Sequence, residues 1–304
     1  MYVCDYGYTT NIYQDELNKI LEGEDEMATS KYGFTKMTVN EFKTWIHQQA
    51  NYRYTGIQIH HTGAPSYSNF YKADGSHEDE LVRQKNIKSF HVNTNGWADI
   101  GQHFTIFPNG VIVTGRKLSN TTAVGIKGWN SNKICIEIYG NFDKGKDIMN
   151  EQQKEAVIAV YGELCKKFNL TPSTSTIRCH AWYTSKGGYL GDYIAGKSTK
   201  TCPGKNFMGF GNSKSAIQNN FIPMIKNYME GKTVETGASV ACGVYKVNSP
   251  DGVLNVRKGP GASYDISCVV KNGEAFTITK INGNWGYLKS GAGWINLNYT
   301  VRVK

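Results

Sequence analysis

Short runs in which apolar and polar residues alternate predict several β-strands in the first two thirds of the chain. Residues 55–61, Thr-Gly-Ile-Gln-Ile-His-His, alternate in this way and stop at a Thr-Gly-Ala-Pro turn. Residues 133–138 and 176–180 form further runs, and residues 102–116 have the pattern of a hairpin around Pro-Asn-Gly. Both histidines of the first run therefore fall at or just past a strand end, where α/β proteins place their chemistry.

Two amphipathic helices are predicted between these strands. Thr38 and Glu41 form a capping box before the apolar positions Phe42, Trp45 and Ile46. Asn150 can cap a second helix. Its apolar positions recur at the helical spacing of three and four: Ala156, Val157, Val160, Tyr161, Leu164 and Phe168. Strands and helices in this order favour an α/β fold, a mixed central sheet flanked by helices, over a bundle or a sandwich.

The composition changes after Met229, which predicts a second domain. Residues 230–242 are rich in Gly, Thr, Ser and Ala without periodicity, as in a flexible linker. From residue 243 to residue 304, short β-compatible runs alternate with Gly-containing turns, which is typical of a small all-β barrel. We therefore expect a first domain over residues 1–229 with an N-terminal extension over 1–37, a linker over 230–242 and a barrel over 243–304.

Composition and charge narrow the class of protein. Of 304 residues, 39% are hydrophobic and 19% are charged, which is ordinary for a soluble globular protein and argues against disorder. The formal net charge of +9 favours an anionic partner, either nucleic acid or an anionic bacterial wall. The alternative is that this charge only keeps the protein soluble. No zinc-finger spacing, RNP-like motif or Lys/Arg-dense helix supports nucleic acid. The 19 tyrosines suit stacking on sugar rings, although Tyr also fills cores and interfaces.

The N-terminal residues and the cysteines of the chain bear on the cellular location of the protein. Residues 1–14 show no basic segment followed by an apolar run, so no secretory signal is expected. No stretch approaches the ~20 apolar residues of a membrane span. Seven scattered cysteines without a CxxC spacing fit reduced thiols in a cytosol.

Three residues from different predicted elements are candidate zinc ligands. His60 lies at the end of an early strand, His180 at the end of a late strand, and Cys202 across a loop from His180. Catalytic zinc takes three protein ligands and keeps a further position for water, and two imidazoles with one thiolate meet that requirement. A lone His or Cys is more often structural than metal-binding, so the residues around these three matter.

Five short segments carry a stronger functional signal than any single residue. They are residues 57–62, 96–104, 109–110 with 115–116, 136–142, and 179–180 with 200–203. In this order they resemble the zinc N-acetylmuramoyl-L-alanine amidase family, which includes small phage lysins and peptidoglycan recognition proteins. The resemblance covers most of residues 50–210. It implies that family's fold, a Zn²⁺ cofactor, and hydrolysis of the amide bond between N-acetylmuramic acid and L-alanine in bacterial peptidoglycan.

The resemblance also implies roles for single residues. The metal ligands that it implies are His60, His180 and Cys202. His61 would then support the centre or the fold. Glu137 falls where some relatives hold an acid beside the attacking water, so it is the expected proton carrier, the alternative being that it only supports the sheet. Lys200 falls where relatives place a positive group near the developing oxyanion.

Four residues are expected to contact the substrate: Gln102, His61, Trp97 and Tyr183. Gln102 stands where several relatives have Tyr, and Gln can donate a hydrogen bond but cannot transfer a proton as a phenol does. Tyr183 lies in the stretch between His180 and Cys202, which is longer than in the smallest relatives. With Tyr189 and Tyr193 it would form either a lid over the substrate or a surface loop.

Three segments near the C-terminus carry a second resemblance. They are residues 254–261 (Leu-Asn-Val-Arg-Lys-Gly-Pro-Gly), 285–288 (Trp-Gly-Tyr-Leu) and 293–295 (Gly-Trp-Ile). They are similar to bacterial SH3-like domains, which implies a wall-binding domain. Tyr264, Trp285 and Tyr287 are the expected contacts to a wall peptide or glycan, whereas Trp285 and Trp294 could equally lie in the core.

The two resemblances together predict an endolysin from a bacteriophage of a Gram-positive host. We expect a monomer that binds peptidoglycan, binds no nucleic acid and does not insert into a membrane. It would stay in the host cytoplasm until a separate membrane-permeabilising partner gives it access to the cell wall. Two alternatives remain: a non-catalytic peptidoglycan-recognition protein, and a wall peptidase that cleaves another bond.

Overall fold

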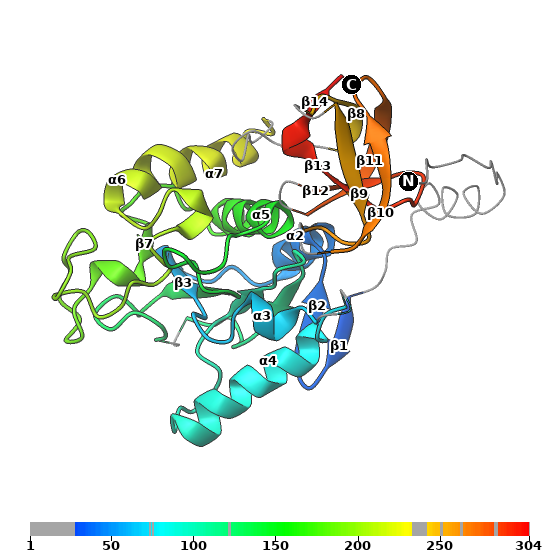
Figure 1. Cartoon of the computed structure of the whole chain (residues 1–304). Helices are drawn as coiled ribbons and strands as arrows, with labels where there is room; N and C mark the ends of the chain where they lie inside the picture. The colour runs from blue at the N-terminus through cyan, green and yellow to red at the C-terminus, as the bar shows by residue number, and fades with distance from the viewer. Residues whose placement is uncertain are drawn as a thin grey trace. The chain divides into compact units, whose positions relative to one another are not determined.

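The computed structural model describes residues 28–72, 74, 76–120, 123–232, 242–249, 252–261, 264–282 and 285–303 (Figure 1). They fall into two compact units, one within Met27–Thr236 and one that contains Gly237–Lys304. Most of the expected linker and residues 1–27 of the expected extension lie outside the described residues. Within the described ranges, no helix is long and apolar enough to cross a membrane.

The larger unit is built on a mixed seven-stranded sheet. Its strands are β1 (Thr29–Lys31), β2 (Phe34–Met37), β3 (Gly56–His61), β4 (Phe104–Ile106), β5 (Ile112–Thr114), β6 (Lys133–Ile138) and β7 (Ile177–Cys179). They lie in the order β1-β2-β5-β4-β6-β3-β7. β3 runs parallel to β6 and β7, and β4 runs parallel to β6, whereas the pairs β1–β2, β2–β5 and β4–β5 are antiparallel. The carboxyl ends of β3, β6 and β7 therefore open at the same edge of the sheet.

Helices and short turns connect these strands. They are α2 (Val39–Gln48), α3 (Tyr67–Phe70), α4 (Glu80–Ser89), η1 (Phe90–Thr94), α5 (Glu151–Lys167), η2 (His180–Trp182), η3 (Phe207–Gly209), α6 (Lys214–Ala216), η4 (Ile217–Phe221) and α7 (Ile222–Met229). The capping box of α2 is present, because Thr38 and Glu41 each accept a hydrogen bond from the other's backbone N–H. The Asn150 side chain accepts from the N–H of Gln153 at the start of α5. Both predicted helix starts are confirmed.

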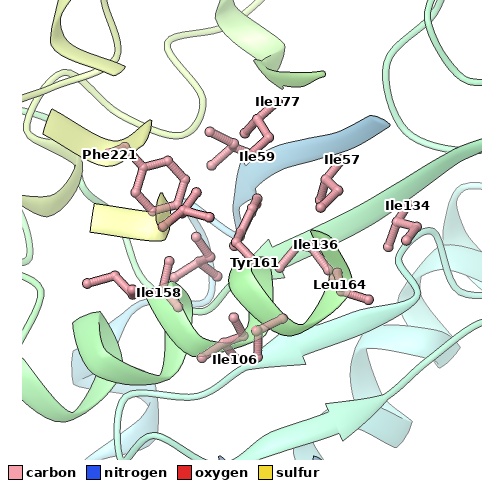
Figure 2. Packing of buried hydrophobic residues seen from close by; sticks show 14 of the residues in the cluster. Ile57, Ile59, Ile106, Ile134, Ile136, Ile158, Tyr161, Leu164, Ile177 and Phe221 are labelled. Atoms are coloured by element: carbon pink, nitrogen blue, oxygen red, sulfur yellow. The ribbon is translucent and has the colours of Figure 1, made fainter. Parts of the chain in front are cut away.

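Helix α5 packs across the sheet and forms the main hydrophobic core with it. Figure 2 shows Tyr161 and Leu164 of α5 beside Ile57 and Ile59 of β3 and Ile136 of β6. All the apolar positions predicted for α5 are buried: Ala156, Val157, Val160, Tyr161, Leu164 and Phe168. Because side chains alternate along a strand, the residues between these isoleucines lie on the other face of the sheet.

Residues 29–37, expected to belong to an N-terminal extension, contribute two strands to the sheet. β1 and β2 pair as a hairpin that turns through Tyr32 and Gly33, with φ of 58° and 78°. β2 then pairs with β5. Phe34 and Met37 are buried, so this stretch is part of the folded unit.

The smaller unit is all-β. Its strands are β8 (Gly243–Val247), β9 (Val253–Arg257), β10 (Ile266–Lys271), β11 (Ala275–Asn282), β12 (Trp285–Leu288), β13 (Trp294–Asn296) and β14 (Thr300–Arg302), with a short turn η5 (Leu297–Tyr299). They form one antiparallel sheet in the order β10-β9-β13-β12-β11-β8-β14. Cys268 is disulfide-bonded, so the expectation of reduced thiols is wrong there, whereas Cys242 is free. The predicted fold class, a mixed α/β sheet followed by a small all-β unit, is confirmed.

Candidate metal centre

Strand alternation places a row of polar side chains on the face of the sheet opposite α5. In β3, Ile57 and Ile59 belong to the core under α5, so Gln58 and His60 point to the other face. Glu137 of β6 is the direct partner of His60 in the parallel pairing of the two strands. Paired residues of neighbouring strands leave a sheet on the same face, so His60 and Glu137 share one side of it.

Three potential ligand atoms converge at this edge of the sheet. One atom from each of His60, His180 and Cys202 lies within 4.8 Å of the others. The Nδ1 atoms of His60 and His180 are 3.2 Å apart. Two nitrogens that bind one zinc at about 2.0–2.1 Å with tetrahedral geometry would lie roughly 3.3 Å apart. The structure thus brings together the three residues singled out from the sequence, with a donor set that suits zinc and a nitrogen–nitrogen distance that fits shared coordination.

Backbone contacts hold the cysteine in place. The backbone N–H of His61 donates to Sγ of Cys202 at 3.3 Å, and the N–H of Ala181 donates to the Cys202 carbonyl at 2.7 Å. Oγ1 of the preceding Thr201 donates to Oδ2 of Asp143 at 2.7 Å. Cys202 is therefore tied to the end of β3 and, with its neighbour Thr201, to the segments that follow β6 and β7.

Burial sets the protonation of the three ligands. It lowers the pKa of His180 to about 4, and the positive charge of Lys200 acts in the same direction. Burial, followed by the charges of His180 and Lys200, holds the pKa of His60 well below its usual value. Burial raises the pKa of the Cys202 thiol above its usual range. The two imidazoles are therefore neutral and ready to bind a cation, whereas the thiol must lose its proton on binding.

Glu137 has the acid–base properties expected of a proton carrier. Burial raises its pKa to about 7, and the positive charge of Lys200 opposes that rise. A carboxyl group with a pKa near neutrality can both take up and release a proton at neutral pH.

The ligands, Glu137 and Lys200 all line one cleft of about 1140 Å³. The cleft continues from the three ligands to α4 and η1. Arg83, Arg116 and Lys200 give its walls positive charge. Since pockets for drug-sized molecules span about 300–1,000 Å³, this cleft is large enough for an extended substrate.

His61 and Trp97, two of the expected substrate contacts, also line this cleft. Nδ1 of His61 accepts a hydrogen bond from the N–H of Phe142 at 3.1 Å, so Nε2 carries the ring proton. Burial lowers the pKa of His61 to about 4, which keeps the ring neutral. Trp97 is 48% exposed and stacks on His91 with ring centroids 4.6 Å apart. One face of the Trp97 ring is therefore open to a ligand, whereas the other face is held against His91.

Gln102 borders the same cleft, but its side chain is fully buried. Its Nε2 donates to Oγ1 of Thr105 at 2.9 Å, and Thr105 donates to Oε1 of Gln84 at 2.8 Å. Among the described residues, Oε1 of Gln102 has no hydrogen-bond partner. The donor expected to face a substrate is instead used inside the fold.

Tyr183 departs from its expected place at the substrate. It is 2% exposed and does not line the cleft. Its hydroxyl accepts a hydrogen bond from Nη1 of Arg178 at 2.7 Å. The guanidinium of Arg178 lies 4.7 Å from the ring centroid of Trp129 and 4.5 Å from that of Tyr189. The centroid of the Tyr183 ring lies 6.4 Å from that of Trp129 and 5.2 Å from that of Tyr189. These ring contacts and the Arg178 hydrogen bond hold Tyr183 within the fold, so it does not cover the cleft.

In the smaller unit, strand pairing gathers two of the three expected wall contacts. Trp285 and Tyr287 lie two residues apart and so on one face of β12. Tyr287 pairs with Trp294 of β13, with ring centroids 5.1 Å apart. Trp285 and Trp294 are half-buried and lie outside the core cluster of the unit. Tyr264 packs over Gly259 instead.

Sequence reasoning did not single out Gln58, Arg83 or Arg116 as site residues. Gln58 carried a detectable signal, because it is a polar residue on the same strand face as His60. Arg83 comes from α4 and Arg116 follows β5, and only the folded chain brings them to the cleft.

Comparison with known proteins gives matches of several kinds. Residues 50–205, about half of the chain, match the family described as N-acetylmuramoyl-L-alanine amidase, Amidase_2. Peptidoglycan-recognition protein SC2 of Drosophila simulans is 36% identical over 63 residues, which are 21% of this chain and 34% of that protein. Peptidoglycan-recognition protein 2 of Holotrichia diomphalia is 33% identical over 87 residues, 28% of this chain and 42% of that protein. The chain thus spans less than half the length of these two curated relatives.

Solved structures also resemble part of this chain. The N-acetylmuramoyl-L-alanine amidase LysC from Clostridium intestinale URNW is 25% identical over 51% of this chain and 80% of that chain, with a TM-score of 0.35.

Proposed function

Because the chain belongs to the N-acetylmuramoyl-L-alanine amidase family, we propose that it hydrolyses the amide bond between N-acetylmuramic acid and L-alanine in bacterial peptidoglycan. The observation that carries the proposal is the convergence of His60, His180 and Cys202 beside Glu137 in a single cleft. A structural cluster of histidines and cysteine would not need a neutral-range acid next to it, or a cleft of this size.

Each residue of the centre has a distinct task in this proposal. A zinc ion held by His60, His180 and Cys202 would polarise the scissile carbonyl and activate the attacking water. Glu137 accepts the proton that the water loses as its oxygen forms a bond to the carbonyl carbon. Glu137 then gives this proton to the leaving nitrogen as the carbon–nitrogen bond breaks, so the enzyme ends the cycle as it began. The Lys200 ammonium stabilises the negative charge that develops on the carbonyl oxygen.

We also propose that the smaller unit is an SH3-like domain that binds the bacterial cell wall. The aromatic group of Trp285, Tyr287 and Trp294 supports this role, because half-buried rings on one sheet face suit sugar or peptide contacts. The net charge of +9 favours adsorption to an anionic wall. Linking two binding units raises the effective concentration of the catalytic unit at its polymer.

Together these proposals describe a monomeric phage endolysin of a Gram-positive host. It acts at the wall after release from the host cytoplasm and needs Zn²⁺ as its cofactor. Peptidoglycan is its partner, and neither nucleic acid nor insertion into a membrane takes part. The curated relatives are peptidoglycan-recognition proteins, which favours a non-catalytic recognition role as the second candidate.

Digestion of purified wall tests the two candidates. The zinc-loaded full chain is expected to release peptides with a free L-alanine amino group and to leave the glycan intact, as identified by mass spectrometry of the products. Cys202→Ser should abolish this release, whereas Cys165→Ser, a buried thiol outside the cleft, should not. New reducing sugar ends, or cleavage confined to the peptide bridge, would contradict the amidase. Sedimentation with walls that stay intact would establish the recognition role instead.

A further inference from the structure

Gln58 is fully buried on the cleft face of β3, two residues before His60. Its Nε2 donates to the carbonyl oxygens of Val124 at 3.0 Å and Trp129 at 2.7 Å. Its Oε1 accepts from the N–H of Ile126 at 3.2 Å and lies 3.1 Å from Nε2 of His60. Both ends of this amide therefore make hydrogen bonds inside the fold.

These partners leave the amide only one orientation. A backbone carbonyl can only accept and a backbone N–H can only donate, so the atom that faces Ile126 must be the oxygen of Gln58. The Gln58 backbone is held as well, because its carbonyl accepts from the Tyr161 hydroxyl at 2.9 Å. An oxygen therefore sits in a defined position next to the ring of His60.

This oxygen selects one tautomer of the His60 ring. Nε2 faces an acceptor and must carry the ring proton, so in the neutral imidazole Nδ1 keeps its lone pair. Nδ1 is the atom that lies 3.2 Å from Nδ1 of His180, on the side where the ligand atoms converge. The ring is thus oriented for a cation before one binds.

The loop over residues 123–129 is built closely around the same side chain. A Cβ atom at Gly125 would lie 1.8 Å from Oε1 of Gln58, and its φ is +78°. Only glycine is compatible with that position, because other residues would both collide with Gln58 and be strained. Ala123, Val124 and Gly125 of this loop line the cleft. One amide therefore links a ligand of the centre to a wall of the cleft.

We propose that Gln58 is the positioning residue of the metal centre, which sets the protonated nitrogen of His60 and anchors the 123–129 loop to that ligand. The inference rests on the proposed zinc centre. Partners behind a metal-binding histidine orient its ring and strengthen its binding, and their loss typically costs about 10–100-fold in metal affinity.

Gln58→Met, which keeps the length of the side chain and removes both polar ends, tests the proposal. Zinc affinity of the full chain, measured by competition with a chelating dye, should fall roughly 10–100-fold. In the metal-free protein, long-range ¹H–¹⁵N spectra should show His60 protonated at Nε2 in the wild type and lose that preference in the variant. This second readout needs neither zinc nor catalysis.

Gln153→Met is a matched control. Gln153 is also a fully buried glutamine whose Nε2 donates to two backbone carbonyls, those of Ile106 and Tyr139, and whose Oε1 accepts from the Tyr67 hydroxyl. It contacts none of the three ligands, so Gln153→Met should destabilise the fold as Gln58→Met does and leave zinc affinity unchanged. Equal losses of zinc affinity in both variants would reduce Gln58 to a structural residue and overturn the proposal.

Gln58→Glu separates the hydrogen bonds of the amide oxygen from those of the amide nitrogen. A carboxyl group at this position still accepts from His60 and Ile126, but it offers at most one proton to the carbonyls of Val124 and Trp129, whereas the amide offers two. This variant should lose stability and retain zinc affinity close to that of the wild type. Unchanged zinc affinity and an unchanged His60 spectrum in Gln58→Met would refute the proposal. Failure of wild-type protein to cleave wall, with zinc affinity that still depends on Gln58, would refute only the proposed amidase.

Discussion

His60 and Glu137 are direct partners in the parallel pairing of β3 and β6, and their side chains leave the sheet on the same face. A candidate metal ligand and the candidate proton carrier are thus set side by side by two central strands rather than by loops. Sites built on strands hold their geometry more closely than sites built on loops, because the sheet restrains the backbone on both sides. The relative position of these two groups should therefore survive changes in the surrounding loops.

Glu137→Gln should separate proton transfer from metal binding. The variant keeps the size of the side chain and loses the base, so the rate of wall hydrolysis should fall about 10²–10⁴-fold. Zinc content, measured by elemental analysis, should stay at the wild-type level. Because burial raises the pKa of Glu137, its ionised form costs folding stability above its usual pKa, and the neutral amide should not lower the free energy of unfolding. A rate within threefold of the wild type would remove Glu137 from the mechanism.

Lys200→Met should change both the rate and its dependence on pH. Loss of a positive group near the developing oxyanion is expected to lower kcat roughly 10²–10³-fold. The Lys200 charge also lowers the pKa of Glu137, so its removal should move the acidic limb of the pH–rate profile to higher pH. Rates from dye-labelled wall between pH 5 and pH 9 would reveal both effects. A lower rate with an unshifted acidic limb would mean that Lys200 acts on the substrate alone.

Zinc binding should release about one proton per ion over the neutral range. Burial lowers the pKa of His180 to about 4 and that of His60 well below its usual value, so both rings are already neutral there. The Cys202 thiol, whose pKa burial raises, is the ligand that must give up a proton. Zinc affinity should thus rise about tenfold per pH unit between about pH 5.5 and about pH 8. Calorimetry in buffers of different ionisation enthalpy measures the proton count. Glu137, with a pKa of about 7, can add up to one further proton when a cation binds beside it, so only release of three protons would mean that a histidine binds zinc from its charged form.

The elements predicted correctly are those whose pattern is local. The strand with Ile57 and Ile59 and the helix that begins after Asn150 bury one regular apolar face each, so their periodicity survives in the sequence. The convergence of His180 and Cys202 with His60 could be proposed only from the resemblance to known amidases. Strand ends that meet at one edge of a sheet leave no spacing rule in the chain.

Elements that are stabilised by polar partners far away in the sequence were not predicted. Helix α4 buries Glu80 and Gln84 beside its apolar residues, so it shows no clear apolar stripe. Oε1 of its buried Gln84 accepts a hydrogen bond from the Thr105 hydroxyl, and Nε2 of Gln84 donates to the backbone carbonyl of Thr114. Both partners lie far from Gln84 in the sequence. The direction of Gln102 is set by the same network, which explains why its side chain turns away from the cleft.

Glu163 should make the larger unit sensitive to acid. It is buried in α5 and accepts hydrogen bonds from His47 of α2, Tyr228 of α7 and Lys166. Burial alone would raise the pKa of Glu163, but these three hydrogen bonds outweigh burial and hold the pKa below its usual value.

A carboxyl group with a lowered pKa stabilises the fold above its unfolded-state pKa, and this stabilisation is lost as the pH falls through the folded-state pKa. Glu163→Gln should therefore lower the free energy of unfolding at pH 7 by about 1.5–3 kcal/mol, the range for hydrogen bonds to charged groups. At an acidic pH low enough for the wild-type carboxyl to take up its proton, the difference between the two proteins should shrink. Urea unfolding at the two pH values measures both quantities. Burial and the charge of Glu151 raise the pKa of Glu155 in the same helix, so Glu155→Gln should show the opposite pH trend. A stability difference that is the same at both pH values would show that Glu163 acts by packing and not by its charge.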